Sequence, residues 1–123
     1  MASKSKRIIN LTANSELATR ARVADDFLSR LTGLLLSPPL MPGEGLLIDP
    51  CTSIHMFGMK FPLDAVFFDK QWRVVGVVES IMPGRMSRFY PQARCCLELP
   101  AGTISDTGTK IGDQLDVKDS EAG

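Results

Sequence analysis

The amino-acid sequence predicts an α+β fold in one domain: a β-rich structure with a curled, mostly antiparallel sheet or open barrel of about seven strands and one main helix. Three observations lead to this prediction. Short apolar segments with strand-like alternation recur along the chain, turn residues separate them, and one segment has a helical apolar period. The 123 residues, of which 44% are hydrophobic and 23% charged, suffice for one packed core.

The N-terminal part of the chain contains two expected strands and the expected helix. Lys6–Thr12 and Leu17–Val23 alternate loosely between apolar and polar residues around a turn at Asn14. Asp25 and its neighbour then precede apolar residues at positions 27, 28, 31, 34 and 35, which line one face of a helix. The prolines at 38 and 39 end this helix, because proline lacks the amide hydrogen that a helix requires.

The remaining elements are mostly strands. Branched and aromatic residues in two neighbouring segments predict a hairpin that turns at Lys70 and Gln71, and apolar residues on both faces place it in the middle of the sheet. Alternation in Arg94–Leu99 puts Cys95 on the core face. The expected elements after position 45 are strands at Leu46–Asp49, Asp64–Asp69, Trp72–Ser80, Arg94–Leu99 and Gln114–Lys118, and a helical turn at Ile104–Thr109.

Charge and cysteine usage exclude several classes of protein. Fourteen basic residues balance fourteen acidic ones, so we expect neither a nucleic-acid partner nor a membrane partner. The basic N-terminal segment is followed by no apolar run of signal-peptide or transmembrane length, and three cysteines make a poor disulfide framework. We therefore expect a cytoplasmic protein with free thiols, one domain over residues 1–123, and a frayed tail at 119–123.

The segment that follows Pro50 contains the most unusual group of side chains. Cys51, His55 and Met59 recur every four residues, and His55 is the single histidine of the chain. A helix or a compact loop would bring the two sulfurs and the imidazole together, which is the ligand set that monovalent copper prefers. Cysteine and methionine are more often ordinary core residues, and the sequence alone does not decide between these interpretations.

A nucleophile and base form a second interpretation of the same segment. His55 could take the proton of Cys51, and Asp64 could orient the imidazole. An aspartate that caps a turn through backbone amides is the competing account of Asp64. Glu98 shares a strand face with Arg94, so an ion pair is the ordinary explanation, whereas a Glu98 buried near His55 would mark a site.

Several landmarks in one order are similar to a known family. They are GLLLSPPLMPGEGLLI, IHMFGMKFPLDAVFFD, YPQARCCLELPAG and IGDQL, and the most specific is the Met-x-x-Pro-Leu-Asp-x-x-Phe pattern that starts at Met59. From about Leu31 to Val117 the chain resembles the domain of unknown function 192 family. The resemblance implies a compact, β-rich α+β fold of one domain with a family-like core at about 15–118, and it brings no established activity.

The sequence leaves three functions open. The first is a noncatalytic module that binds a small molecule or a protein at the Cys51–Asp64 loop, where Lys60 and the candidate residues above flank a loop-to-strand junction. The second is a small enzyme that uses His55 with Asp64 or Cys51, and the third is a soft-metal carrier. We expect no cofactor and no resident metal. The candidate binding residues are Cys51, His55, Met59, Lys60, Asp64 and Glu98.

Overall fold

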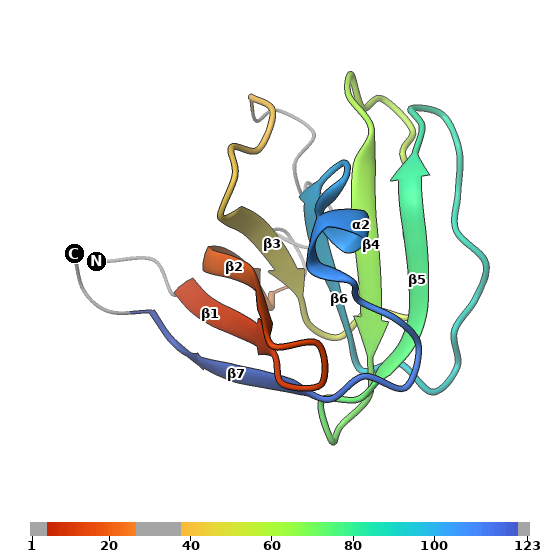
Figure 1. Cartoon of the computed structure of the whole chain (residues 1–123). Helices are drawn as coiled ribbons and strands as arrows, with labels where there is room; N and C mark the ends of the chain where they lie inside the picture. The colour runs from red at the N-terminus through yellow and green to blue at the C-terminus, as the bar shows by residue number, and fades with distance from the viewer. Residues whose placement is uncertain (1–4, 27–37, 121–123) are drawn as a thin grey trace.

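A computed structural model describes residues 5–26 and 38–120 (Figure 1). The main helix that we expect after Asp26 lies outside these residues. None of the helices described is long and apolar enough to cross a membrane. The described elements are β1 (Ser5–Asn10), β2 (Ser15–Ala24), β3 (Glu44–Ile48), β4 (Leu63–Phe68), β5 (Val74–Ile81), β6 (Cys95–Pro100), α2 (Thr103–Thr107) and β7 (Leu115–Asp119).

The strands form one sheet in the order β5-β4-β6-β3-β2-β1-β7. Every neighbouring pair is antiparallel except β2 and β3, which run parallel with Arg20 opposite Glu44 and Ala24 opposite Ile48. The prediction of a mostly antiparallel, β-rich α+β fold is therefore confirmed. The parallel pair requires a crossover connection between β2 and β3.

The sheet curls until its two outer strands meet at one end. The Val74 amide donates to the Asp113 carbonyl at 2.9 Å, and the Gly112 amide donates to the Val74 carbonyl at 2.8 Å. Arg73 and Gln114 form an additional antiparallel bridge there. These bonds join the start of β5 to the segment that enters β7, so the sheet is a half-barrel (Figure 1).

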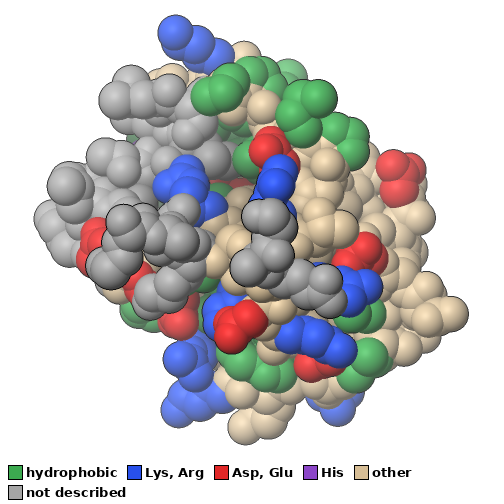
Figure 2. All heavy atoms as spheres, turned by 90° about the vertical axis from the view of Figure 1, so that its left-hand side faces the viewer, with side chains coloured by type: hydrophobic (Ala, Val, Ile, Leu, Met, Phe, Trp, Pro, Cys, Tyr) green, Lys and Arg blue, Asp and Glu red, His purple; other side chains and the backbone are tan. Residues whose placement is uncertain are grey.

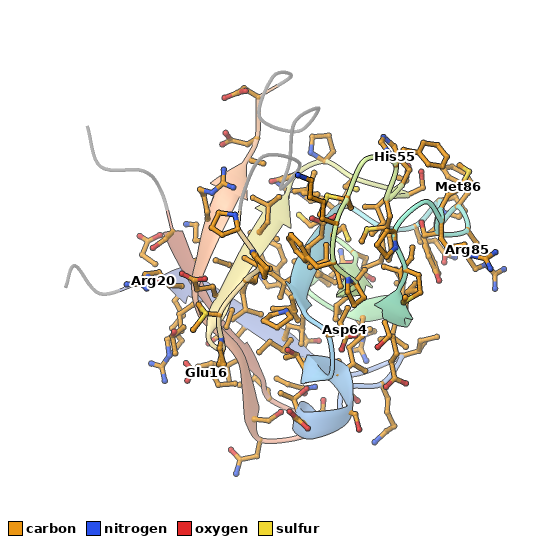
Figure 3. The ribbon with its side chains drawn as sticks, turned by 90° about the horizontal axis from the view of Figure 1, so that it is seen from above. Glu16, Arg20, His55, Asp64, Arg85 and Met86 are labelled. Atoms are coloured by element: carbon orange, nitrogen blue, oxygen red, sulfur yellow. The ribbon has the colours of Figure 1, made fainter. Side chains whose placement is uncertain are left out.

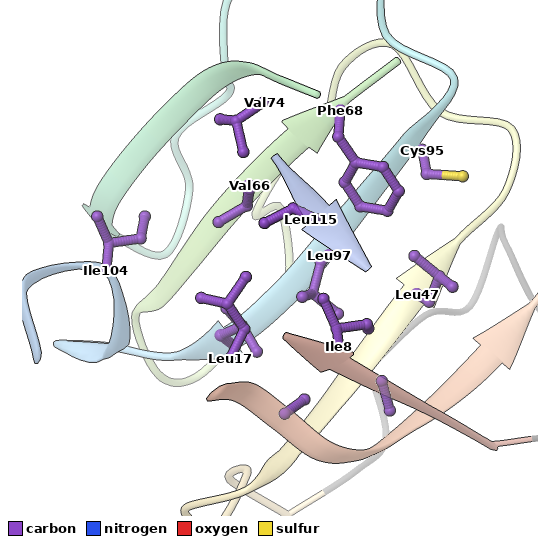
Figure 4. Packing of buried hydrophobic residues seen from close by; sticks show 13 residues of the cluster. Ile8, Leu17, Leu47, Val66, Phe68, Val74, Cys95, Leu97, Ile104 and Leu115 are labelled. Atoms are coloured by element: carbon purple, nitrogen blue, oxygen red, sulfur yellow. The ribbon is translucent and has the colours of Figure 1, made fainter. Parts of the chain in front are cut away.

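The curled sheet encloses an inner core of large apolar side chains (Figure 4). Ile8 and Leu115 from one end of the sheet contact the same cluster as Val66 and Phe68 near the other end. Ile104 of α2 closes the open side of this cluster. Cys95 is 1% exposed and belongs to the inner core, as its strand position predicts.

A second apolar cluster, which we call the outer core, covers the opposite face of β3, β4 and β6. Leu46, Ala65 and Phe67 contribute to it from the strands, and Ile54 and Met56 contribute from a loop. All six residues of β4 are buried because both of its faces are covered. β5 differs: the hairpin exists as predicted, but β5 is an edge strand rather than a central one.

Acidic and basic side chains are intermixed on the face over β1, β2 and β7 (Figure 2). Three ion pairs join neighbouring strands there, and a fourth lies within β7. The pairs are Lys6–Asp119, Arg7–Glu16, Arg20–Glu44 and Lys118–Asp116. This face consequently has no field of one sign.

Candidate functional site

Two loops, residues 51–62 and 82–94, lie side by side and are joined through their backbones. The Met56 amide donates to the Arg85 carbonyl at 2.7 Å, and the Ser87 amide donates to the Ile54 carbonyl at 2.8 Å. The Tyr90 amide donates to the Thr52 carbonyl at 2.8 Å. We call these two segments the paired loops, and their mutual hydrogen bonds hold them in a defined conformation on the outer core.

Side chains of the first loop alternate between the core and the solvent. Ile54 and Met56 are buried in the outer core, whereas His55 and Phe57 between and after them are exposed. This is the two-residue period of an extended chain. Among the described residues of this loop, His55 alone forms a β-bridge, with Met86 of the second loop. Residues 51–62 thus form an extended loop with strand-like alternation.

The paired loops expose four large apolar side chains. Phe57 is 53% exposed, Met82 54%, Phe89 63% and Met86 64%. The His55 ring stacks on Phe57 with ring centroids 4.9 Å apart, and His55 lies directly opposite Met86. Figure 3 shows His55, Met86 and Arg85 gathered on this side of the molecule. His55, Phe57 and Met86 therefore contribute to an exposed, largely apolar surface on the paired loops.

The spacing of Cys51, His55 and Met59 does not direct all three side chains the same way. Cys51 and Met59 are half-buried and pack against the outer core, whereas His55 is exposed. The Cys51 thiol donates to the Ser53 carbonyl at 3.2 Å, and the His55 Nδ1 accepts the Phe57 amide at 3.3 Å. Among the described residues, no group of three or more His, Cys, Asp or Glu side chains is arranged to hold a metal ion.

Asp64 is wholly buried and is directed to a different part of the molecule. Its Oδ1 accepts the Ser80 amide at 2.8 Å, and its Oδ2 accepts the amides of Gly102 at 3.1 Å and Ile104 at 2.8 Å. Asp64 therefore caps backbone amides of β5 and α2. Figure 3 shows it well apart from His55, so the structure does not bring together the imidazole and the carboxylate that the nucleophile-and-base interpretation requires, and the capping account of Asp64 fits its contacts.

Glu98 lies in the interior of the sheet rather than on a solvated face. Its side chain is on the outer-core side of β6, where Leu46 and Ala65 are its strand partners, and it is 6% exposed. Burial raises the pKa of the Glu98 carboxyl to about 7. The ion pair between Glu98 and Arg94 that alternation suggests does not appear among the described residues. Arg94 pairs with Asp49 instead, and its Nε lies 3.4 Å from Asp49 Oδ1.

The exposed apolar surface of the paired loops differs from the set of residues that the sequence singles out. Lys60 is exposed at the end of the first loop, but the second loop contributes side chains that we did not assign to a site. The segment from Met82 to Tyr90 contains a signal for this surface. It includes the large apolar residues Met86 and Phe89 but lacks the apolar–polar alternation of a strand. Large apolar residues in a segment rich in glycine and proline are candidates for an exposed contact surface.

Comparison with protein families accounts for most of the chain. The model of the DUF192 family, described as an uncharacterized ACR, matches residues 9–117. The chain belongs to this family. DUF192 relatives include a UPF0127 protein of Thermococcus sibiricus, 34% identical over 119 residues, with 89% of this chain and 73% of the relative covered. A UPF0127 protein of Pyrococcus horikoshii is 30% identical over 114 residues, with 88% and 96% covered.

Two solved structures share the fold. A protein of unknown function from Novosphingobium aromaticivorans superposes with a TM-score of 0.78 at 19% identity and covers 91% of this chain and 83% of its own. A protein of Sinorhizobium meliloti, described as a candidate transcription regulator, has a TM-score of 0.78 at 26% identity and covers 94% of each chain. The first likeness, at 19% identity, shows the fold alone.

Proposed function

We propose that this DUF192 protein is a noncatalytic binding module that recognises a segment of another protein on its paired loops. The observation that carries the proposal is the exposure of Phe57, Met82, Met86 and Phe89 on two loops that are locked together. Exposed apolar side chains that gather in one place are typical of contact surfaces, whereas scattered ones are not. A rigid sheet that positions such loops is the usual architecture of a recognition site.

The fixed backbone of the paired loops supports binding over catalysis. Hydrogen bonds between the loops reduce the entropy that binding would otherwise cost, because the contact surface is formed before the partner arrives. Two of the groups required for acid–base or nucleophilic chemistry are engaged elsewhere: Asp64 accepts three backbone amides, and Cys51 donates to Ser53. A cytoplasmic location belongs to the same proposal, and the buried thiols of Cys95 and Cys96, which form no disulfide, support it.

Selection of displayed random peptides on the immobilised protein tests this function. Peptides that are enriched on the wild-type protein should bind about tenfold or more weakly when Phe57 and Met86 are both changed to serine, as expected for anchors of an interface. The matched control is Leu11→Ser with Ile111→Ser, which removes two side chains of similar exposure, 56% and 64%, outside the paired loops. Peptides that bind both double variants equally, or an absence of enriched peptides, would refute the proposal.

A further inference from the structure

The paired loops carry charge of one sign. Neither residues 51–62 nor residues 82–94 contain an aspartate or a glutamate, and together they contain Lys60, Arg85, Arg88 and Arg94. The whole chain is neutral, so this segregation is local. It contrasts with the face over β1, β2 and β7, where acidic and basic side chains are intermixed (Figure 2).

Three of these cations are available to a partner. Arg94 pairs with Asp49, but Lys60, Arg85 and Arg88 form no ion pair with any residue in the described ranges 5–26 and 38–120. All three are exposed. An exposed cluster of one sign, with no acid of its own loops to neutralise it, attracts ligands of the opposite charge and orients them on approach.

The structure fixes the positions of the two arginines. Arg85 ends a tight turn in which its amide donates to the Met82 carbonyl at 3.1 Å, and Gly84 supplies the positive φ of 83° that this turn needs. The Arg88 guanidinium lies over the Tyr90 ring at 5.7 Å, and that ring stacks on Phe67 of β4 at 4.4 Å. The backbone of Arg85 is therefore held in an ordered turn, and the Arg88 guanidinium lies on a packed ring.

The apolar and the basic side chains share the same surface. Met86 follows Arg85 directly, and Phe89 follows Arg88, so two of the four exposed apolar side chains have a cation beside them in the sequence. In Figure 3 Arg85 and Met86 extend on the same side as His55. A ligand that covers the second loop therefore meets both apolar side chains and positive charges.

We propose that the occupant of the paired loops is an acidic protein segment with interspersed apolar side chains. Its carboxylates pair with Lys60, Arg85 and Arg88, and its apolar side chains pack on Phe57 and Met86. Arginine suits this task because its planar guanidinium binds a carboxylate through two parallel hydrogen bonds. This inference rests on the proposed function and adds the chemistry of the partner.

Synthetic peptides of about fifteen residues separate the charge from the apolar contribution. One peptide alternates Glu or Asp with Leu and Phe, a second has Gln and Asn in place of the acids, and a third has Ser in place of the apolar residues. Fluorescence anisotropy on the full chain should give the tightest binding for the first peptide. Its affinity should fall at least about fivefold between roughly 50 and 300 mM NaCl, because salt screens exposed charges.

Matched double variants locate the charge effect. Arg85→Gln with Arg88→Gln should weaken the acidic peptide about tenfold and leave the Gln/Asn peptide unchanged within about twofold. The control is Arg20→Gln with Arg22→Gln, which removes two exposed arginines of β2, where Arg20 lies far from Arg85 (Figure 3). This control should retain wild-type affinity.

The outcomes distinguish this inference from the function on which it rests. Equal binding of the acidic and the Gln/Asn peptides, both lost in the Phe57 and Met86 serine variant, overturns the acidic partner and leaves the binding module intact. Tighter binding of a single-stranded RNA or a DNA duplex than of the acidic peptide also overturns it, since a basic surface with exposed aromatics suits nucleic acid too. Binding of none of these probes refutes both proposals.

Discussion

The Asp64 carboxylate accepts the amide hydrogen of Ile104 at 2.8 Å, so a residue of β4 caps the N-terminus of α2. No side chain of the helix's own N-terminal segment makes this cap, and Gly102 there has a positive φ of 98°. The helix has five residues, too few to be stable in isolation. Its orientation therefore depends on a carboxylate that lies about forty positions earlier in the chain.

Changing Asp64 to alanine should destabilise the protein strongly. The three backbone amides that bond to Asp64 would remain in a buried region without an acceptor, at a cost of roughly 3 kcal/mol or more in the free energy of unfolding. Urea denaturation measures this change. Asp116→Asn on the surface of β7 is the control and should change stability by less than about 0.5 kcal/mol. A mild effect of Asp64→Ala would show that α2 does not depend on this cap.

Glu98 should make the stability depend on pH. Burial raises its pKa in the folded state from 4.5 to about 7, so the folded state binds a proton that the unfolded state releases. The stabilisation that this bound proton provides is complete below pH 4.5 and is lost as pH rises through 7. The free energy of unfolding should therefore fall by roughly 3 kcal/mol over that window. Denaturation at a series of pH values should show wild-type stability falling across this window relative to Glu98→Gln.

The Glu98→Gln variant should accordingly be the more stable protein at pH 8, where the wild-type carboxylate is charged inside the sheet. Glu79→Gln on the exposed part of β5 serves as the control for the loss of one negative charge. Parallel pH profiles for the wild type and Glu98→Gln would contradict the assignment of this titration to Glu98.

The three thiols should react in a fixed order. Burial raises the pKa of the Cys95 thiol to about 12 and that of the Cys96 thiol well above its usual range, whereas Cys51 is only half-buried. Iodoacetamide at pH 8 should modify Cys51 first, as mapped by mass spectrometry of tryptic peptides. In denaturant all three should react at similar rates. A Cys51 rate that titrates well below pH 8 would instead favour the nucleophile interpretation of this residue.

Gly76 should not tolerate alanine. A Cβ atom at this position of β5 would lie 2.3 Å from the Tyr90 ring, which is itself stacked on Phe67. We expect Gly76→Ala to cost about 1–3 kcal/mol in the free energy of unfolding. Combining it with Tyr90→Ala should relieve most of that cost, so the two changes should be strongly non-additive in a double-mutant cycle. Additive effects would contradict the contact.

Local patterns predict the strands but not their positions in the sheet. The branched and aromatic residues of β4 and β5 indicate a hairpin, and apolar side chains on both faces of β5 suggest a central strand. β5 is instead the last strand of the sheet, and beside β4 its start pairs with Asp113 and Gly112, far along the chain. Pairing between distant segments has no local signature.

The candidate site illustrates the same limit. Alternation assigns Glu98 and Arg94 to one strand face, but it does not show that Asp49 will take the arginine or that an outer core also covers the Glu98 face of β6. The paired loops are separated by the whole β4–β5 hairpin, so their contact could not be predicted from spacing. The exposed residues of the second loop became recognisable as part of a surface only when the fold placed them next to His55.

The pairing of β1 with β7 places residues 6 and 119 opposite each other. β1 is synthesised before β7 and cannot pair with it until β7 has been made. Until then Ile8 lacks Leu115 as a neighbour. Closure of the half-barrel is thus a late event that joins the most distant parts of the chain, and such topologies acquire their native state slowly. Ribosome-bound chains that lack β7 should be readily cleaved by proteases.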